Sequence, residues 1–233
     1  MKIDDPVAVA EQYATESNLE ARRSLYVDAE GPDPRELALA AVAETTPGRV
    51  LEVGGGPGEL SARIADELGA EVTMLDVSPR MVELARERGV DATVGDVQQL
   101  PFDDGSFDCA VAAWMLFHVP DLDRGLAELA RVLRPGGRLV AVTNGEAHLE
   151  ELRAIAGAAA WDRVFTRENG AELIARHFGT VERRDADGWV TVDDDSVVRG
   201  FLDSLGADEP IEPAPYELPI RSRRATSIFV ATR

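Results

Sequence analysis

Apolar and polar positions alternate in a regular rhythm between residues 49 and 143. Five apolar runs are typical of buried strands: RVLEVG, EVTMLDV, DATVGDV, FDCAVAAW and GRLVAVTN. Amphipathic stretches lie between them, among them GELSARIADELG, SPRMVELARERG and DLDRGLAELARVLRPGG. Strands that alternate with helices predict an α/β fold, in which right-handed βαβ units build a mostly parallel sheet with helices on both faces.

The pattern is looser on either side of this region. Residues 6–30 read as helical, and Pro34 begins a second predicted helix, PRELALAAVAET. After Asn144, HLEELRAIAGAAAWDRV and ENGAELIARHF predict two helices, GTVERRDA a sixth strand and ATSIFVATR a seventh. We therefore expect an N-terminal helical lid at residues 1–45 and one α/β domain at residues 46–233. A helical insert at about 188–222 precedes the last strand.

Composition and net charge make several classes of binding partner improbable. At 233 residues, with 45 % hydrophobic and 29 % charged positions, the chain suits one soluble domain, and no apolar run is long enough to span a membrane. The N-terminus lacks the apolar core of a signal peptide, so we expect a cytoplasmic protein, monomeric or homodimeric, without a membrane partner. The net charge of −19 repels phosphates, which disfavours nucleic acid. Cys109 is the only cysteine and the histidines are scattered, so we expect no metal site.

The loop Gly54-Gly55-Gly56-Pro57-Gly58 joins the first predicted strand to a helix. Glycines allow positive φ angles and let a ligand approach the backbone, and the helix that follows offers free N–H groups. The spacing is G-x-G-x-G, not the G-x-G-x-x-G of dinucleotide sites. Glu52 and Glu59 flank the loop and disfavour a pyrophosphate, so they point to a cationic or hydroxyl-rich ligand. A tight strand–helix connection without a ligand is the alternative.

Two further acids end the next strands. Asp76 is the last residue of MLD, and Asp96 is the last residue of VGD. Ligands of such sheets bind outside the carboxyl ends of the strands, which would place Asp76 beside a ribose diol and Asp96 beside an exocyclic amino group. Together with the flanking acids of the loop, they fit an adenosine whose other end is a zwitterion.

Four segments carry a family resemblance: VLEVGGGPGEL, MLDVSPRMVELA, VGDVQQLPFDDGSFD and LAELARVLRPGGRL. In this order, across about residues 46–143, the chain resembles the class I S-adenosylmethionine-dependent methyltransferases, most closely their ubiquinone/menaquinone-type small-molecule branch. The resemblance implies a Rossmann-like, seven-stranded, mostly parallel sheet and S-adenosylmethionine as cofactor, with S-adenosylhomocysteine as product. Gly55 and Pro57 depart from residues common in this loop, but neither blocks the role of its backbone.

The resemblance also implies a set of cofactor-binding residues. They are Glu52, Gly54, Gly56, Asp76, Val77, Met81, Asp96, Val97 and Ala113. Within this set, the loop and its preceding acid would contact the methionine moiety. Asp76 would take the ribose hydroxyls, while Asp96 and Val97 would meet the adenine edge, which Met81 borders.

The segment EQYATESNLEARRSLY resembles one subgroup of these enzymes, in which it folds over the cofactor. By that likeness, Tyr13, Asn18 and Arg22 are candidate lid contacts, with Arg22 available to the cofactor carboxylate. Ordinary helix packing and a surface ion pair are the alternative for Tyr13 and Arg22.

Methyl transfer from a sulfonium is an in-line displacement that chiefly requires alignment and exclusion of water. His118, after the fourth predicted strand, is the candidate catalytic base, and a structural histidine before Pro120 is the alternative. Met115 is a candidate for the acceptor pocket, whereas Trp114 and Phe117 suit either the pocket or the core.

Past the fifth strand, Asn144 and His148 are candidate substrate contacts, with a loop turn and a helix start as the alternative. We interpret His177 as structural, and the acids at 193–195 as the N-cap of a helix rather than a metal site.

The sequence thus predicts methyl transfer from S-adenosylmethionine to an O, N or C atom of a small-molecule acceptor, with the insert covering the acceptor site. A non-catalytic S-adenosylmethionine-binding protein or partner subunit is the alternative. A nicotinamide-dependent oxidoreductase is disfavoured by the loop spacing and by the additional acid Asp96.

Overall fold

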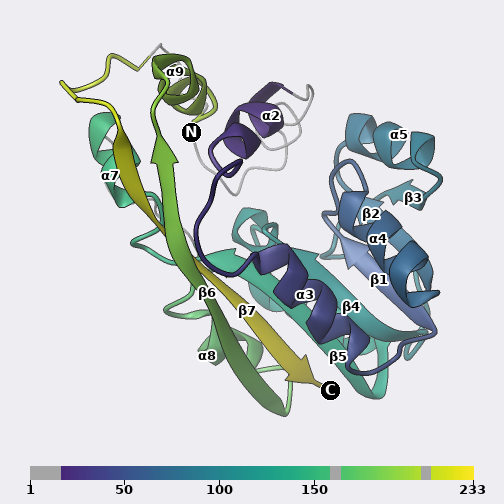
Figure 1. The fold of residues 1–233 in the computed structure, drawn as a ribbon. Helices are drawn as coiled ribbons and strands as arrows, with labels where there is room; N and C mark the ends of the chain where they lie inside the picture. The colour runs from purple at the N-terminus through teal and green to yellow at the C-terminus, as the bar shows by residue number, and fades with distance from the viewer. Residues whose placement is uncertain (1–16, 158–163, 206–210) are drawn as a thin grey trace.

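The computed structural model describes residues 17–157, 164–205 and 211–233. Its centre is a seven-stranded sheet in the order β3-β2-β1-β4-β5-β7-β6 (Figure 1). β7 runs antiparallel to both of its neighbours, and the other pairs are parallel. The strands are β1 (Arg49–Val53), β2 (Glu71–Asp76), β3 (Asp91–Val94), β4 (Phe107–Ala113), β5 (Leu133–Asn144), β6 (Thr180–Val192) and β7 (Ile220–Thr232). This arrangement confirms the predicted Rossmann-like α/β fold.

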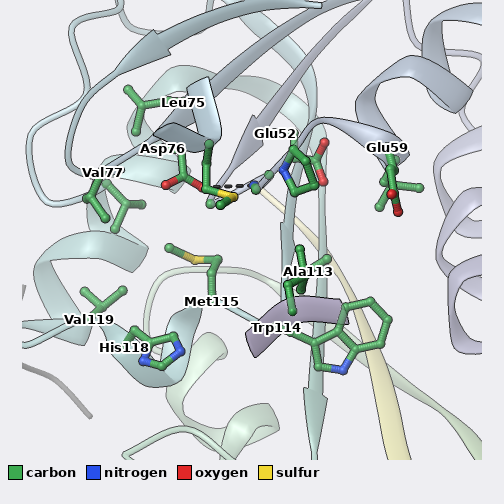
Figure 2. A pocket seen from close by; sticks show the side chains of 18 of the residues that line it. Glu52, Glu59, Leu75, Asp76, Val77, Ala113, Trp114, Met115, His118 and Val119 are labelled. Carbon is green, nitrogen blue, oxygen red and sulfur yellow. Dashed lines mark hydrogen bonds between the residues drawn. The ribbon is translucent and has the colours of Figure 1, made fainter. Parts of the chain in front are cut away.

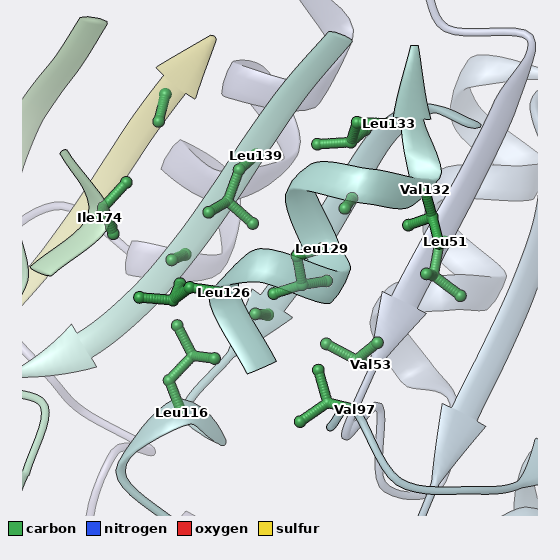
Figure 3. Packing of buried hydrophobic residues seen from close by; sticks show 14 of the residues in the cluster. Leu51, Val53, Val97, Leu116, Leu126, Leu129, Val132, Leu133, Leu139 and Ile174 are labelled. Carbon is green, nitrogen blue, oxygen red and sulfur yellow. The ribbon is translucent and has the colours of Figure 1, made fainter. Parts of the chain in front are cut away.

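Helices cover both faces of the sheet. They are α2 (Ser17–Ser24), α3 (Pro34–Ala43), α4 (Glu59–Leu68), α5 (Pro79–Glu87), the 3₁₀ turn η1 (Leu116–His118), α6 (Leu122–Val132), α7 (Glu150–Ile155), α8 (Gly170–Ile174) and α9 (Asp195–Asp203). The central strands are apolar on both faces because each face is buried under helices. In β1, Val50 packs with α3 and α4, while Leu51 and Val53 pack with α6 on the opposite face (Figure 3).

A third apolar cluster lies beyond the sheet. β6 and β7 extend past the other strands (Figure 1). Their far ends supply Val190, Val192 and Ile220 to a core shared with Phe201 of α9 and Leu152 of α7. α2 packs against α9 at the same place.

The insert is therefore shorter than predicted. Residues 188–192 and 220–222 belong to strands, because Val190 and Val192 alternate into the third cluster and keep β6 paired with β7. The structure confirms the N-cap role of the acids at 193–195, since Asp194 accepts a hydrogen bond from the Ser196 N–H at 2.7 Å.

The two helices predicted after β5 are also shorter in the described residues. α7 ends before Gly157, whose positive φ angle of 61° suits the residue after a helix. α8 ends at Ile174, and His177 beyond it bonds Asp123 at 2.8 Å, a surface contact that agrees with a structural histidine.

Candidate functional site

A cavity of about 420 Å³ opens at the carboxyl ends of β1, β2 and β4 (Figure 2). The glycine loop and Asp76 form one side of it, and the segment after β4 forms the other. Predicted site residues that line this cavity are Glu52, Gly54, Gly56, Asp76, Val77, Met81, Asp96, Val97, Ala113, Met115 and His118. Most of the predicted site is thus gathered around one volume.

The glycine loop has the backbone that only glycine adopts easily. Gly54, Gly56 and Gly58 have φ angles of 63°, 58° and 79°. A Cβ on Gly54 would lie 2.6 Å from the Cβ of Met115. Packing against Met115 therefore already requires glycine at this position. A Cβ on Gly56 would meet no protein atom within 4 Å. Gly56 therefore leaves open space beside the loop, which is what a ligand close to the backbone needs.

Asp76 ends β2 beside this loop and is only 8 % exposed. Its carboxylate accepts the Gly56 N–H at 2.9 Å and the Ser78 N–H at 2.8 Å. Burial raises the pKa of Asp76, and the backbone N–H groups of Ser78, Gly56 and Val77 act against that rise. The hydrogen bond to Gly56 ties the acid to the loop, so one ligand group would contact both.

Glu52 is the most deeply buried acid of the cavity wall, with 2 % of its surface exposed. Burial raises its pKa to about 7, against the effect of the Ser61 hydroxyl, which donates to the carboxylate. The nearby Asp76 adds to the rise. The carboxyl groups of Glu52 and Asp76 thus lie next to the loop, and the site favours a positively charged ligand group.

Asp96 follows β3 and is oriented by Gln98. The Gln98 N–H and side-chain amide each donate to the Asp96 carboxylate at 2.8 Å. The amide oxygen of Gln98 in turn accepts the Asp121 N–H at 3.0 Å. This chain of hydrogen bonds fixes the acid at the rim of the cavity, beside Val97.

The segment after β4 forms the opposite wall. Trp114 has a φ angle of 54°, and its side chain lines the cavity with those of Met115 and His118 (Figure 2). His118 is half-buried, and its ring centroid lies 4.5 Å from that of Phe117. Phe117 itself belongs to the core cluster under the sheet. The wall is therefore apolar, with one imidazole.

Comparison with known proteins identifies the central domain of the chain. A family model described as a methyltransferase domain matches residues 51–141. The ubiquinone/menaquinone biosynthesis C-methyltransferase UbiE of Methylobacterium nodulans is 39 % identical over 107 residues, which are 42 % of each chain. Residues 51–141 lie in a class I S-adenosylmethionine-dependent methyltransferase domain. The resemblance inferred from the four sequence segments is thereby confirmed.

Two further matches cover a larger share of this chain. An uncharacterized transposon protein of Streptomyces fradiae is 37 % identical over 145 residues, 59 % of this chain and 39 % of that one. A solved S-adenosylmethionine-dependent methyltransferase of Thermotoga maritima, described as a possible histamine N-methyltransferase, is 25 % identical with a TM-score of 0.56. The match covers 85 % of this chain and 88 % of that chain. The chain spans 39–42 % of the length of the first two curated relatives.

The methyltransferase family and fold imply S-adenosylmethionine as the cofactor. The residues present fit that group. Gly56 leaves room against the backbone, and Asp76 and Asp96 offer carboxylates at two strand ends. Within the described ranges, no three His, Cys, Asp or Glu side chains gather as a metal site would require. No helix there is long and apolar enough to cross a membrane.

Helix α2 turns a different arginine toward the methyltransferase cavity than the sequence suggested. Arg22 bonds Ser204 after α9, with 3.3 Å from Nε to the hydroxyl, and does not line the cavity. Arg23 does line it and pairs with Glu59 at 2.7 Å. Its Nε is buried without a hydrogen-bond partner among the described residues. Tyr13 lies outside the described residues, and the Asn18 side chain is likewise not described.

Asn144 and His148 lie beyond the cavity lining of the methyltransferase domain. Asn144 accepts hydrogen bonds from the Trp114 indole and from Thr226. His148 is 3 % exposed, accepts the Ala225 N–H at 3.1 Å through Nδ1, and contacts the Tyr26 hydroxyl at 2.9 Å through Nε2. His148 is held in a structural position between β7 and the N-terminal segment.

Several wall residues of the methyltransferase cavity were not predicted as site residues. They are Leu19, Arg23, Asp33, Arg35, Leu60, Arg63 and Gln98. Most come from α2, α3 and α4, whose surfaces meet only in the folded chain. Gln98 alone had a signal, because a side-chain amide two residues after Asp96 can bond that acid locally.

Proposed function

We propose that the chain transfers a methyl group from S-adenosylmethionine to a small-molecule acceptor. The observation that carries this proposal is the convergence of the glycine loop, Glu52, Asp76 and Asp96 on one cavity of the methyltransferase domain. Pyrophosphate ligands would be repelled by these acids, whereas adenosine hydroxyls, an adenine amino group and a sulfonium would be attracted.

Each wall of the cavity would take one part of the cofactor. Asp76 would accept hydrogen bonds from the ribose hydroxyls, with Val77 beside it. Asp96 would accept from the adenine amino group, and Val97 and Met81 would border the ring. These assignments are supported by the positions of Met81 and Val97 in the cavity lining and by the fixed orientation of Asp96.

The methionine end would lie along the glycine loop. The start of α4 would lie at this end, and Glu52, which also lines the cavity, would lie next to it. Arg23 would bind the carboxylate in place of Arg22, because Arg23 lines the cavity and its Nε has no hydrogen-bond partner among the described residues. Glu59 already pairs with Arg23 at 2.7 Å and would hold this guanidinium in position.

The chemistry requires little of the protein beyond alignment. S-adenosylmethionine supplies a methyl group that its sulfonium already activates. The chain would hold the acceptor in line from the side of Ala113 and Met115 and keep water out. His118, on the same wall, would take a proton from an acceptor that loses one. The N-terminal lid and the residues between β6 and β7 would close over the acceptor.

Two measurements test this function. First, thermal shift compares S-adenosylmethionine with NADH and NADPH, since a ligand that binds only the native state raises the melting temperature. We expect a rise with S-adenosylmethionine alone; a rise with a nicotinamide cofactor alone would overturn the proposal.

Second, transfer of labelled methyl is screened over quinol, phenol and amine acceptors. Binding without transfer to any acceptor would favour a non-catalytic S-adenosylmethionine-binding protein.

A further inference from the structure

Trp114 has a backbone conformation that a bulky side chain rarely adopts. Its φ angle of 54° lies in the left-handed region, which disfavours residues other than glycine by about 1–2 kcal/mol. Two contacts hold it there: its N–H donates to the Val142 carbonyl at 2.8 Å, and its indole Nε1 donates to the Asn144 side chain at 3.2 Å. Strained residues that surroundings hold in place cluster at functional sites. The strain here directs an aromatic ring along the cavity wall.

The Asn144 amide is oriented by its partners. Its Oδ1 accepts both the Trp114 indole N–H and the Thr226 hydroxyl, the latter at 2.9 Å. Thr226 is buried opposite Asn144 in the pairing of β5 with β7, and Arg167 donates its N–H to the Asn144 carbonyl at 3.2 Å. An indole can only donate, so the amide oxygen must face Trp114. The Nδ2 group is then the outward end of the amide.

This Nδ2 group has no hydrogen-bond acceptor in the part of the chain that the structure describes. Asn144 is half-buried at the end of β5, next to the ring that lines the cavity. A donor pair with a fixed orientation beside an aromatic face recognises an acceptor atom on a flat molecule.

We propose that Trp114 is the platform on which a planar acceptor lies, and that Asn144 donates a hydrogen bond from Nδ2 to an oxygen of that acceptor. The inference rests on the proposed function and specifies its substrate class: flat, mostly apolar molecules with a carbonyl or other ring oxygen. Thr226 is a positioning residue that acts through Asn144.

A matched pair of probes isolates the hydrogen bond. Acetophenone and α-methylstyrene have nearly the same shape, and only the ketone offers an oxygen. Their affinities are measured by ligand-observed NMR, with and without S-adenosylhomocysteine. The ratio of the affinity for acetophenone to that for α-methylstyrene is then compared between variants, so that general hydration effects cancel. In Asn144→Asp the outward N–H₂ becomes a carboxylate oxygen, which repels the ketone. We expect the preference for acetophenone to fall about fivefold or more, the equivalent of one hydrogen bond.

Asn169→Asp is the matched control. Asn169 also accepts through Oδ1 from a threonine, Thr166, but its Nδ2 already donates to the Val164 carbonyl at 3.1 Å. We expect the wild-type ratio there. Should Asn144→Asp not fold, Thr226→Val releases the amide orientation in an isosteric way and lowers the ratio about twofold or more.

The outcomes separate the two proposals. An unchanged ratio in folded Asn144→Asp or Thr226→Val overturns the assignment of Asn144, even when S-adenosylhomocysteine binds normally. Absence of S-adenosylhomocysteine binding to the wild type overturns the proposed function, while the ratio still reports on Asn144 in the free protein. A drop in both Asn144→Asp and Asn169→Asp shows a general loss of packing and also counts against the inference.

Discussion

The buried carboxyl of Glu52 makes stability depend on pH. Burial raises its pKa from 4.5 to about 7, so the folded state favours the protonated form. The stability from this group is full below pH 4.5 and is lost as pH rises through about 7. Glu52→Gln is neutral throughout. Between pH 4.5 and 8, the free energy of unfolding of the variant, relative to wild type, should therefore rise by up to about 3 kcal/mol.

Urea denaturation at pH 5 and pH 8 measures this difference. Glu87→Gln, which removes a carboxylate that is exposed, serves as the control. If Glu52→Gln behaves as Glu87→Gln does at both values, the raised pKa of Glu52 is contradicted.

His118 has a testable role at the same scale. It lines the cavity beside Met115, within reach of an acceptor on that wall. For an acceptor that loses a proton, His118→Ala should lower kcat about 100-fold or more, because general bases contribute at least that much. The affinity for S-adenosylhomocysteine, which lacks the transferred methyl, should change little. Steady-state kinetics checks this; an unchanged kcat would leave alignment as the whole of catalysis.

At the scale of elements, the loop between β1 and α4 offers a clean comparison. Gly56 and Gly69 have similar positive φ angles of 58° and 67°, and a Cβ at either would meet no protein atom within 4 Å. Alanine at each should cost about 1–2 kcal/mol of stability through backbone strain alone. Gly56→Ala alone places a methyl group in the cavity, so it should also weaken S-adenosylmethionine binding about tenfold or more.

Melting temperature and calorimetric affinity of both variants separate strain from steric exclusion. Equal affinities in Gly56→Ala and Gly69→Ala would show that the cofactor does not approach this loop.

Helix α2 makes the two neighbouring arginines distinguishable. Arg23 lines the cavity and Arg22 contacts Ser204, so Arg23→Ala should weaken S-adenosylmethionine binding about tenfold through loss of a charged donor. Arg22→Ala should instead lower stability by about 1 kcal/mol with a smaller change in affinity. Calorimetry and denaturation are run on both. A larger affinity loss in Arg22→Ala would restore the assignment made from the sequence.

The sequence predicts best the elements that depend on the local pattern of apolar and turn-forming residues. The strand that ends at Asp76 and the loop at Gly54 follow from apolar runs that break into turn residues. The sequence does not predict which face of α2 lies against the cavity, because Arg22 and Arg23 are adjacent and equally charged. Their partners, Ser204 and Glu59, lie far away in the chain.

At the scale of the whole molecule, the segment before α3 is hydrogen-bonded to the edge strand β6. Glu30 pairs with Trp189 of β6 through two backbone hydrogen bonds, of 2.8 Å and 3.2 Å. The buried Arg224 of β7 donates to the carbonyls of Glu30 and Pro32. A Cβ on Gly188 would lie 1.9 Å from the Glu30 carbonyl oxygen, so only glycine permits this approach. These contacts join residues about 160 to 190 positions apart, which no local pattern predicts.

The central claim is that the chain binds S-adenosylmethionine through the carboxylate at the end of β2. Isothermal titration calorimetry of the full chain with S-adenosylmethionine, and separately with S-adenosylhomocysteine, tests it most directly. We predict micromolar binding of both, a loss of about tenfold or more in Asp76→Asn, and no change in the exposed control Asp66→Asn. No binding of either compound to the wild type, or equal affinity in the two variants, would contradict the account.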